Sequence, residues 1–247
     1  MDTQKQYFSR AEAAQAQYDI GLRSHMLKVY NYMASGLALT GIVAYAVAHL
    51  AVASWAPLAL TDFGMTLYTT PLKWVVMLAP LAFVFALSLG INRMSYATAS
   101  MVFWVYAAAM GLSLSSILLV FTGESVARVF FISAATFAAT SLYGYTTKRD
   151  LSRFGSFMFM GLIGIVLASV VNIFLGSSAL QFAISVIGVL VFTGLTAWDT
   201  QRIKEIYTEL DGSEIAGKKA LMGALSLYLN FINLFMMMMH LFGSQRE

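Results

Sequence analysis

Cysteine is absent from the 247 residues, and charged residues make up only 11% of them. The lack of cysteine excludes disulfides, cysteine nucleophiles and cysteine-ligated metals, and it leaves the redox compartment undetermined. A soluble domain carries about 25% charged residues, so the low share here argues against one. The net charge is only +3, and the basic residues are spread over several segments, whereas nucleic-acid binding needs a dense basic face. We therefore expect no nucleic-acid partner.

Apolar residues, in contrast, make up 59% of the chain and occur in long continuous runs. A chain inside a bilayer satisfies its backbone only as helices or a closed barrel. The strands of a barrel alternate apolar and polar residues, and these runs do not. A helical span needs about 20 apolar residues. The sequence therefore predicts an all-α integral membrane protein with seven transmembrane helices, in one domain over residues 25–247, near 28–52, 72–93, 97–121, 126–146, 155–176, 179–201 and 220–242.

Lys and Arg are distributed unevenly over the segments between these spans. With the N-terminus inside, the inner segments hold twelve of the 15 and the outer segments hold three, Lys73, Arg128 and Arg246. Cytoplasmic segments of membrane proteins carry an excess of positive residues. The asymmetry therefore predicts a cytoplasmic N-terminus, an odd number of spans and a C-terminus on the outer side.

Residues 1–24 precede the first span and are mostly polar. They lack the order of charged, apolar and small residues that marks a cleaved signal peptide. We expect a cytoplasmic N-terminal tail. It is either solvated or a short interfacial helix whose apolar side is Tyr7, Phe8, Tyr18 and Leu22.

Polar and small residues recur at helical spacing inside the last two spans. In the seventh span Gly223, Ser226, Asn230, Asn233 and Met237 share one face. In the sixth, a similar stripe is Ser185, Gly188, Phe192, Thr196 and Asp199. Small residues and hydroxyls often serve only to pack helices together. The carboxamides, including Asn172 of the fifth span, need several hydrogen-bond partners and are the stronger candidates for a polar lining.

Asp199 is the most informative single residue, because an ionisable side chain inside a membrane is costly and marks a functional site by default. Two simpler interpretations stay open: it begins a solvated inner loop, or it forms a local pair with Arg202 three residues on. In the functional interpretation the helix continues and Asp199 faces inward. Asn230 then lies near its level, and Arg93 at the inner end of the second span is the candidate counter-charge.

Other chemistry has little support in the sequence. His49 and His240 lie near the outer ends of their spans, without a carboxylate at ligand spacing. No catalytic constellation is visible. We therefore predict no metal site, no cofactor and no enzymatic activity.

Four segments resemble one family. They are AWDTQRIK at 197–204, ALSLYLNFINLF at 224–235, NRMS at 92–95 and VNIF at 171–174. They are similar to the Bax inhibitor-1 family, also called the transmembrane Bax-inhibitor-motif family, in its bacterial branch. The resemblance implies a seven-helix fold with the last helix central, a location in the bacterial inner membrane, and a pH-sensitive calcium leak. It also implies a sensor of two aspartates with an arginine from the second helix nearby, at positions matching Asp199, Asn230 and Arg93.

The chain departs from that pattern at Asn230, where the family often has aspartate. Two close carboxylates cannot both ionise cheaply, and an Asp–Asn pair lacks this like-charge effect. We therefore expect weaker or acid-shifted pH gating. One carboxylate and a few amide oxygens also fall short of the six to eight oxygens that calcium prefers. Weak binding nevertheless suits an ion path, because a conducted ion must also leave its site.

The sequence thus favours a pH-sensitive cation leak channel, with calcium as the first candidate ion and the lipid bilayer as its surroundings. Asp199, Asn230 and Arg93 would form the pH latch, and Asn233, Asn172 and Ser226 the polar lining of the ion path. The alternative is a non-conducting regulator that binds other membrane proteins, such as a quality-control protease. Deleting residues 1–24 separates the two hypotheses. A proton-coupled transporter is disfavoured because no internal repeats are visible.

Overall fold

The computed structural model describes the backbone of residues 2–246 and the side chains of residues 16–246. Within these residues seven helical segments are long and apolar enough to cross a membrane, which confirms the predicted fold class. The elements in chain order are α1 (Asp2–Ala51), β1 (Val52–Trp55), β2 (Leu58–Leu60), α2 (Asp62–Thr69), α3 (Leu72–Gly90), α4 (Tyr96–Leu114), α5 (Ile117–Val120), α6 (Gly123–Thr146), α7 (Ser152–Leu175), α8 (Ser178–Glu205) and α9 (Ser213–Phe242).

The helix ends lie where the sequence supplies caps. Ser95, Thr122 and Ser177 each accept a hydrogen bond from a backbone N–H in the first turn of α4, α6 and α8, as N-cap residues do. Gly176 ends α7 with a φ of 60°, a left-handed conformation that glycine adopts without steric cost. A single tight turn therefore connects α7 to α8.

The two last helices extend beyond their predicted spans. α8 continues to Glu205 and α9 already begins at Ser213, whereas the apolar runs end at 201 and begin at 220. Hydropathy marks only the apolar part of a helix, and Lys, Arg and Glu in the extensions are good helix formers. As a consequence, Asp199 lies inside a helix rather than at its end.

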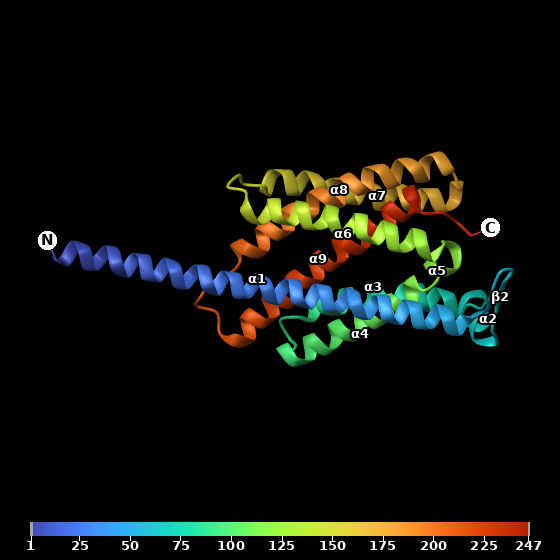
Figure 1. Ribbon diagram of the computed structural model, residues 1–247, viewed down its shortest axis with the longest axis horizontal. Coiled ribbons are helices and arrows are strands. Elements are labelled where there is room, and N and C mark those ends of the chain that lie inside the picture. The colour runs from blue at the N-terminus through green and yellow to red at the C-terminus, as the bar shows by residue number, and fades with distance from the viewer. Residues whose placement is uncertain (1, 247) are drawn as a thin grey trace.

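α1 is one continuous helix that runs from Asp2 into the bundle. Figure 1 shows its N-terminal part extending well beyond the other helices. The side chains of Tyr7 and Phe8, two of the four residues predicted to face the membrane interface, lie outside the described residues. Leu22 is buried in the core and the Tyr18 ring lies 5.4 Å from that of Tyr207. These two side chains therefore pack against the protein itself.

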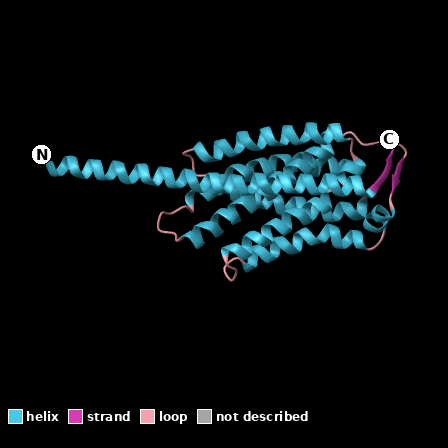
Figure 2. Ribbon diagram, turned by 60° about the horizontal axis from the view of Figure 1, so that its bottom comes forward, coloured by secondary structure: helices cyan, strands magenta, loops and turns pink. Residues whose placement is uncertain are grey.

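α9 is the central helix of the bundle, as the family resemblance implied. In its most apolar 18-residue window 67% of the residues are buried, against 6% in the peripheral α7. Figure 1 shows α9 crossing between a group formed by α6, α7 and α8 and a group formed by α1, α3 and α4. Figure 2 shows the helices side by side, with the β1–β2 hairpin at the end opposite the N-terminus. Asn230, near the middle of α9, is therefore enclosed by protein.

Candidate functional site

The polar stripe of α9 faces α8. Gly223 leaves room for Ile203 of α8, whose nearest atoms would lie 3.1 Å from an added Cβ. At this end of the stripe α9 therefore approaches α8 closely, because Gly223 has no side chain. Farther along, Gly188 of α8 accommodates Met237, whose Cγ lies 2.7 Å from the corresponding position. Ser226, Asn230 and Asn233 lie between these two contacts in the sequence of α9. The two stripes predicted from the sequence therefore meet along the α8–α9 contact.

Asp199 is buried at this contact, with 7% of its surface exposed. Its Oδ1 lies 2.9 Å from Nη2 of Arg202. Its Oδ2 accepts a hydrogen bond from Nδ2 of Asn230 on α9, over 2.8 Å. The helix continues past Asp199 to Glu205, so this residue does not begin a solvated loop. Both carboxylate oxygens are engaged, one along α8 and one across to α9.

Arg202 is the counter-charge of Asp199. Its side chain is 47% exposed, and its guanidinium carbon lies 4.9 Å from the centre of the Trp198 ring. Nη2 also lies 3.5 Å from Oγ of Ser226, to which it donates. Arg202 therefore links the buried carboxylate to the outside of the bundle. The local pair, which the sequence offered as a simpler interpretation, coexists with the inward contact to Asn230.

Arg93, in contrast, does not reach Asp199. It is exposed in the turn between α3 and α4, and its backbone N–H donates to the carbonyl of Gly90. Among the side chains that the structure describes, no ion pair joins it to Asp199. The physical reason is lateral placement, because α3 packs chiefly against α2 and α4, while α8 packs against α6, α7 and α9. The arginine that pairs with Asp199 is therefore Arg202 and not Arg93.

Asn172 also lies away from the site. Its Oδ1 accepts from the backbone N–H of Ser177, and its Nδ2 donates to Oε1 of Gln181 over 3.2 Å. These bonds close the turn between α7 and α8. Gln181 precedes Asp199 by 18 residues, or roughly 27 Å along a helix. The structure therefore places Asn172 at the opposite end of α8 from the predicted latch.

Asn233 satisfies its amide within its own helix. Its Nδ2 donates to the carbonyl oxygen of Leu229 over 2.8 Å. The side chain is half-buried on the same stripe as Asn230 and Ser226. Asn233 and Ser226 thus remain on the α8-facing side of α9, while Asn172 does not join them.

A chain of hydroxyls that no sequence pattern indicated lies beside the site. The Tyr30 hydroxyl of α1 lies 2.7 Å from Oγ of Ser141 on α6, which lies 2.9 Å from Oγ1 of Thr200 on α8. Thr200 in turn donates to the carbonyl of Thr196. This chain connects α1, α6 and α8 next to Asp199. Thr200 stands in the AWDTQRIK segment, but the sequence carries no signal for Tyr30, since its partners lie more than a hundred residues away.

Gln201, the next residue, fixes the loop between α6 and α7. Its Oε1 accepts from the backbone N–H of Leu151, and its Nε2 donates to the carbonyl of Arg149, both over 2.8 Å. Three consecutive residues of α8 therefore hold three neighbours in place. Asp199 holds α9, Thr200 holds α6, and Gln201 holds the loop before α7. Within the described side chains, no three His, Asp or Glu gather in a way that could hold a metal ion.

Comparison with known proteins identifies the family. The family model described as "Inhibitor of apoptosis-promoting Bax1" matches residues 22–247. The chain belongs to the Bax inhibitor-1 family. A relative in Escherichia coli K12, the inner membrane protein YbhL, is 45% identical over 230 residues, which cover 92% of this chain and 94% of that protein.

Two further relatives are described only as uncharacterized proteins. One from Rickettsia prowazekii is 46% identical over 230 residues, covering 93% of each chain. One from Caulobacter vibrioides is 46% identical over 238 residues, covering 96% of this chain and 95% of that one. Together with the seven apolar helices, these similarities identify a bacterial Bax inhibitor-1 family member that is a multi-pass inner-membrane protein.

Proposed function

We propose that this protein is a slow, pH-sensitive cation leak in the inner membrane, with calcium as its principal ion. In this proposal Asp199, Arg202 and Asn230 form the latch that keeps the path closed. The observation that carries the proposal is the buried Asp199 carboxylate, which is held by Arg202 at 2.9 Å and by Asn230 of the central helix at 2.8 Å. An ionisable group retained inside a membrane bundle usually serves ions or protons.

The latch acts through the charge of Asp199. The ionised carboxylate pairs with Arg202 and accepts from Asn230, which ties α8 to α9. Protonation of Asp199 removes the ion pair. The half-exposed Arg202 side chain can then move away from the carboxylate. The groups that face the carboxylate are Arg202 on its own helix and Asn230 on α9. Protonation is therefore expected to loosen the α8–α9 contact.

The ligands at this contact suit passage rather than storage of calcium. They are one carboxylate, the amide oxygen of Asn230 and the hydroxyl of Ser226, fewer than the six to eight oxygens of a tight calcium site. Conduction requires binding that is weak enough for the ion to leave. In this proposal the protein carries out no covalent chemistry and needs no cofactor.

The test is calcium flux into liposomes that contain the purified protein, at mildly acidic and mildly alkaline pH. Native protein is expected to leak faster than empty liposomes, with a rate that depends on pH. Asp199→Asn keeps a side chain of the same shape but cannot pair with Arg202. Its flux is expected to be the same at both pH values, and an unchanged pH dependence in this variant would refute the latch.

A second candidate function is that of a non-conducting regulator that binds other membrane proteins, such as a quality-control protease. It is favoured by α1, whose N-terminal part extends beyond the bundle and offers a handle (Figure 1). Removal of residues 2–15 spares Leu22 and Tyr18, which pack against the bundle. The regulator predicts that this truncation abolishes partner binding, whereas the leak predicts that calcium flux is unaffected.

A further inference from the structure

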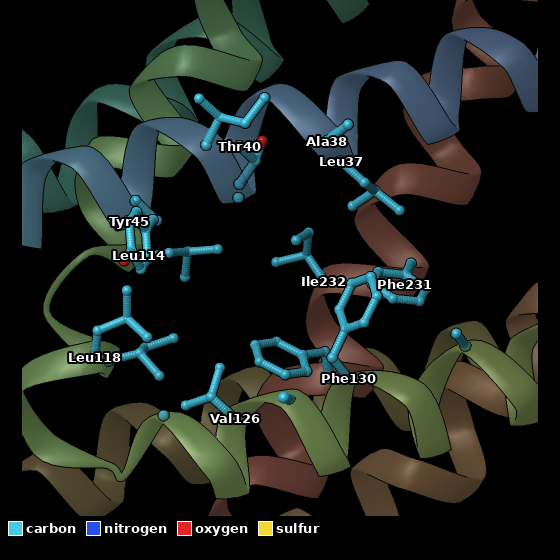
Figure 3. A pocket seen from close by; sticks show the side chains of 18 of the residues that line it. Leu37, Ala38, Thr40, Tyr45, Leu114, Leu118, Val126, Phe130, Phe231 and Ile232 are labelled. Atoms are coloured by element: carbon cyan, nitrogen blue, oxygen red, sulfur yellow. The ribbon is translucent and has the colours of Figure 1, made fainter.

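A deep apolar groove separates α1 from α6. The groove holds a cavity of about 980 Å³, which is also lined by residues of α9 and α5. Figure 3 shows Leu37, Ala38 and Tyr45 of α1 facing Val126 and Phe130 of α6 across this space. Ligand pockets in proteins have volumes of about 300–1,000 Å³. The groove is therefore large enough to hold a substantial apolar molecule.

The side chains on the walls of this groove are mostly apolar. The hydroxyl of Thr40 is already used, because Oγ1 donates to the carbonyl of Ala107 and lies 2.6 Å from the Tyr228 hydroxyl. Ile42 and Phe131 on the two walls remain 67% and 71% exposed. Apolar surface of this kind is stabilised by apolar contact and not by water. Acyl chains of the surrounding bilayer have the matching chemistry.

One end of the groove carries a fixed positive charge. Arg246 lines the cavity, and its guanidinium carbon lies 4.3 Å from the centre of the Trp55 ring. Its Nε donates to the carbonyl of Phe121 and its backbone N–H to that of Val120. None of the lining residues is acidic, and no carboxylate pairs with Arg246 in the part of the chain that the structure describes. A guanidinium held in this way is well suited to a phosphate.

We propose that this groove binds one membrane phospholipid, with its acyl chains between α1 and α6 and its phosphate on Arg246. Apolar walls and a single cationic end match the two halves of such a molecule, and basic pockets between transmembrane helices bind lipid head groups elsewhere. The inference is independent of the ion path, since the groove lies on the α1–α6 side of α9 and the Asp199 latch lies on the α8 side.

Two glycines provide a matched pair of variants. Gly41 lines the groove, and a Cβ added there would meet no atom within 4 Å. Gly164 of α7 is equally open but does not line the groove. The Cβ of Gly41→Leu therefore enters the groove without meeting protein atoms, while Gly164→Leu makes the same chemical change elsewhere. Gly123, a third open position that lines the groove, provides Gly123→Leu if Gly41→Leu does not fold.

The experiment is native mass spectrometry of the full chain purified in a mild detergent, with phospholipid identified by its mass and phosphorus content. Native protein and Gly164→Leu are expected to retain one phospholipid per chain. Gly41→Leu is expected to retain about fivefold less, which corresponds to a loss of about 1 kcal/mol of binding free energy. Arg246→Gln tests the phosphate contact and is expected to lower retention about threefold.

Several results would overturn the proposal. They are a native protein without a lipid adduct, an adduct that contains no phosphorus, or equal retention by Gly41→Leu and Gly164→Leu. If Arg246→Gln retains lipid at the native level, Arg246 does not bind the phosphate. Thermal unfolding of each variant in the same detergent shows whether a loss of lipid reflects a loss of fold.

Discussion

Asp199 has one oxygen on a half-exposed arginine and the other on a buried asparagine. This asymmetry gives the two partners different roles. Asn230 lies on the central helix and fixes where the carboxylate sits, while Arg202 neutralises its charge from the side that reaches out of the bundle. Removal of the asparagine would misplace the carboxylate, and removal of the arginine would leave it in place without a counter-charge.

Arg202 and Arg93 make a matched pair of substitutions. Arg202→Gln removes the ion pair with Asp199, and an ion pair whose arginine is half-exposed and screened by solvent contributes about 1 kcal/mol. The calcium leak in liposomes is therefore expected to rise up to about fivefold at alkaline pH, since 1.4 kcal/mol is a factor of ten. Arg93→Gln is expected to leave the leak within about twofold of native. The opposite ranking would return the latch role to Arg93.

At the scale of the helices, glycines bring the neighbours of α8 close to the site. A methyl group on Gly144 of α6 would overlap the backbone carbonyl of Ala197. One on Gly155 of α7 would overlap the ring of Trp198. Both contacts lie within two residues of Asp199. α6 and α7 therefore approach α8 closely at Ala197 and Trp198, next to the Asp199 carboxylate that contacts α9.

Substitution of these glycines tests this close approach. Gly144→Ala forces α6 away from α8, and overpacking of this kind costs about 1–3 kcal/mol. The apparent midpoint of thermal unfolding in detergent is expected to fall. Gly164→Ala meets no atom within 4 Å and is expected to be neutral or to stabilise by up to about 1 kcal/mol, as alanine does inside helices. An equal effect of both substitutions would show that the α6–α8 approach is not tight.

The elements and the site differ in how far the sequence predicts them. Seven spans were predictable because a bilayer demands long apolar runs, and helical spacing placed Ser226 and Asn230 on one face. Hydropathy could not show that the helix continues past Arg202, because the extension is charged but helical. Depth in the membrane placed Asn230 near Asp199. It could not place Arg93, because depth leaves the lateral position of α3 undetermined.

At the scale of the whole molecule, the positive-inside asymmetry predicts which end of the bundle faces the cytoplasm. The chain lacks cysteine, so single cysteines report their side of the membrane without background. Ala59 in the hairpin and Ser213 at the start of α9 are both exposed. In intact cells, a membrane-impermeant maleimide is expected to label Ala59→Cys but not Ser213→Cys. Labelling of Ser213→Cys alone would show that the orientation is the opposite of the predicted one.

The central claim is that the α8–α9 contact at Asp199 and Asn230 gates a cation leak. The most direct test is calcium flux into liposomes for native protein and Asn230→Asp, side by side at mildly acidic and mildly alkaline pH. The variant replaces Nδ2 of Asn230, which lies 2.8 Å from the Asp199 carboxylate, with a carboxylate oxygen, and two carboxylates this close cannot both ionise cheaply. The account predicts a leak in the native protein that becomes more steeply pH-dependent in Asn230→Asp. Native protein that leaks no faster than empty liposomes would contradict it, and a leak confined to the variant would favour the regulator.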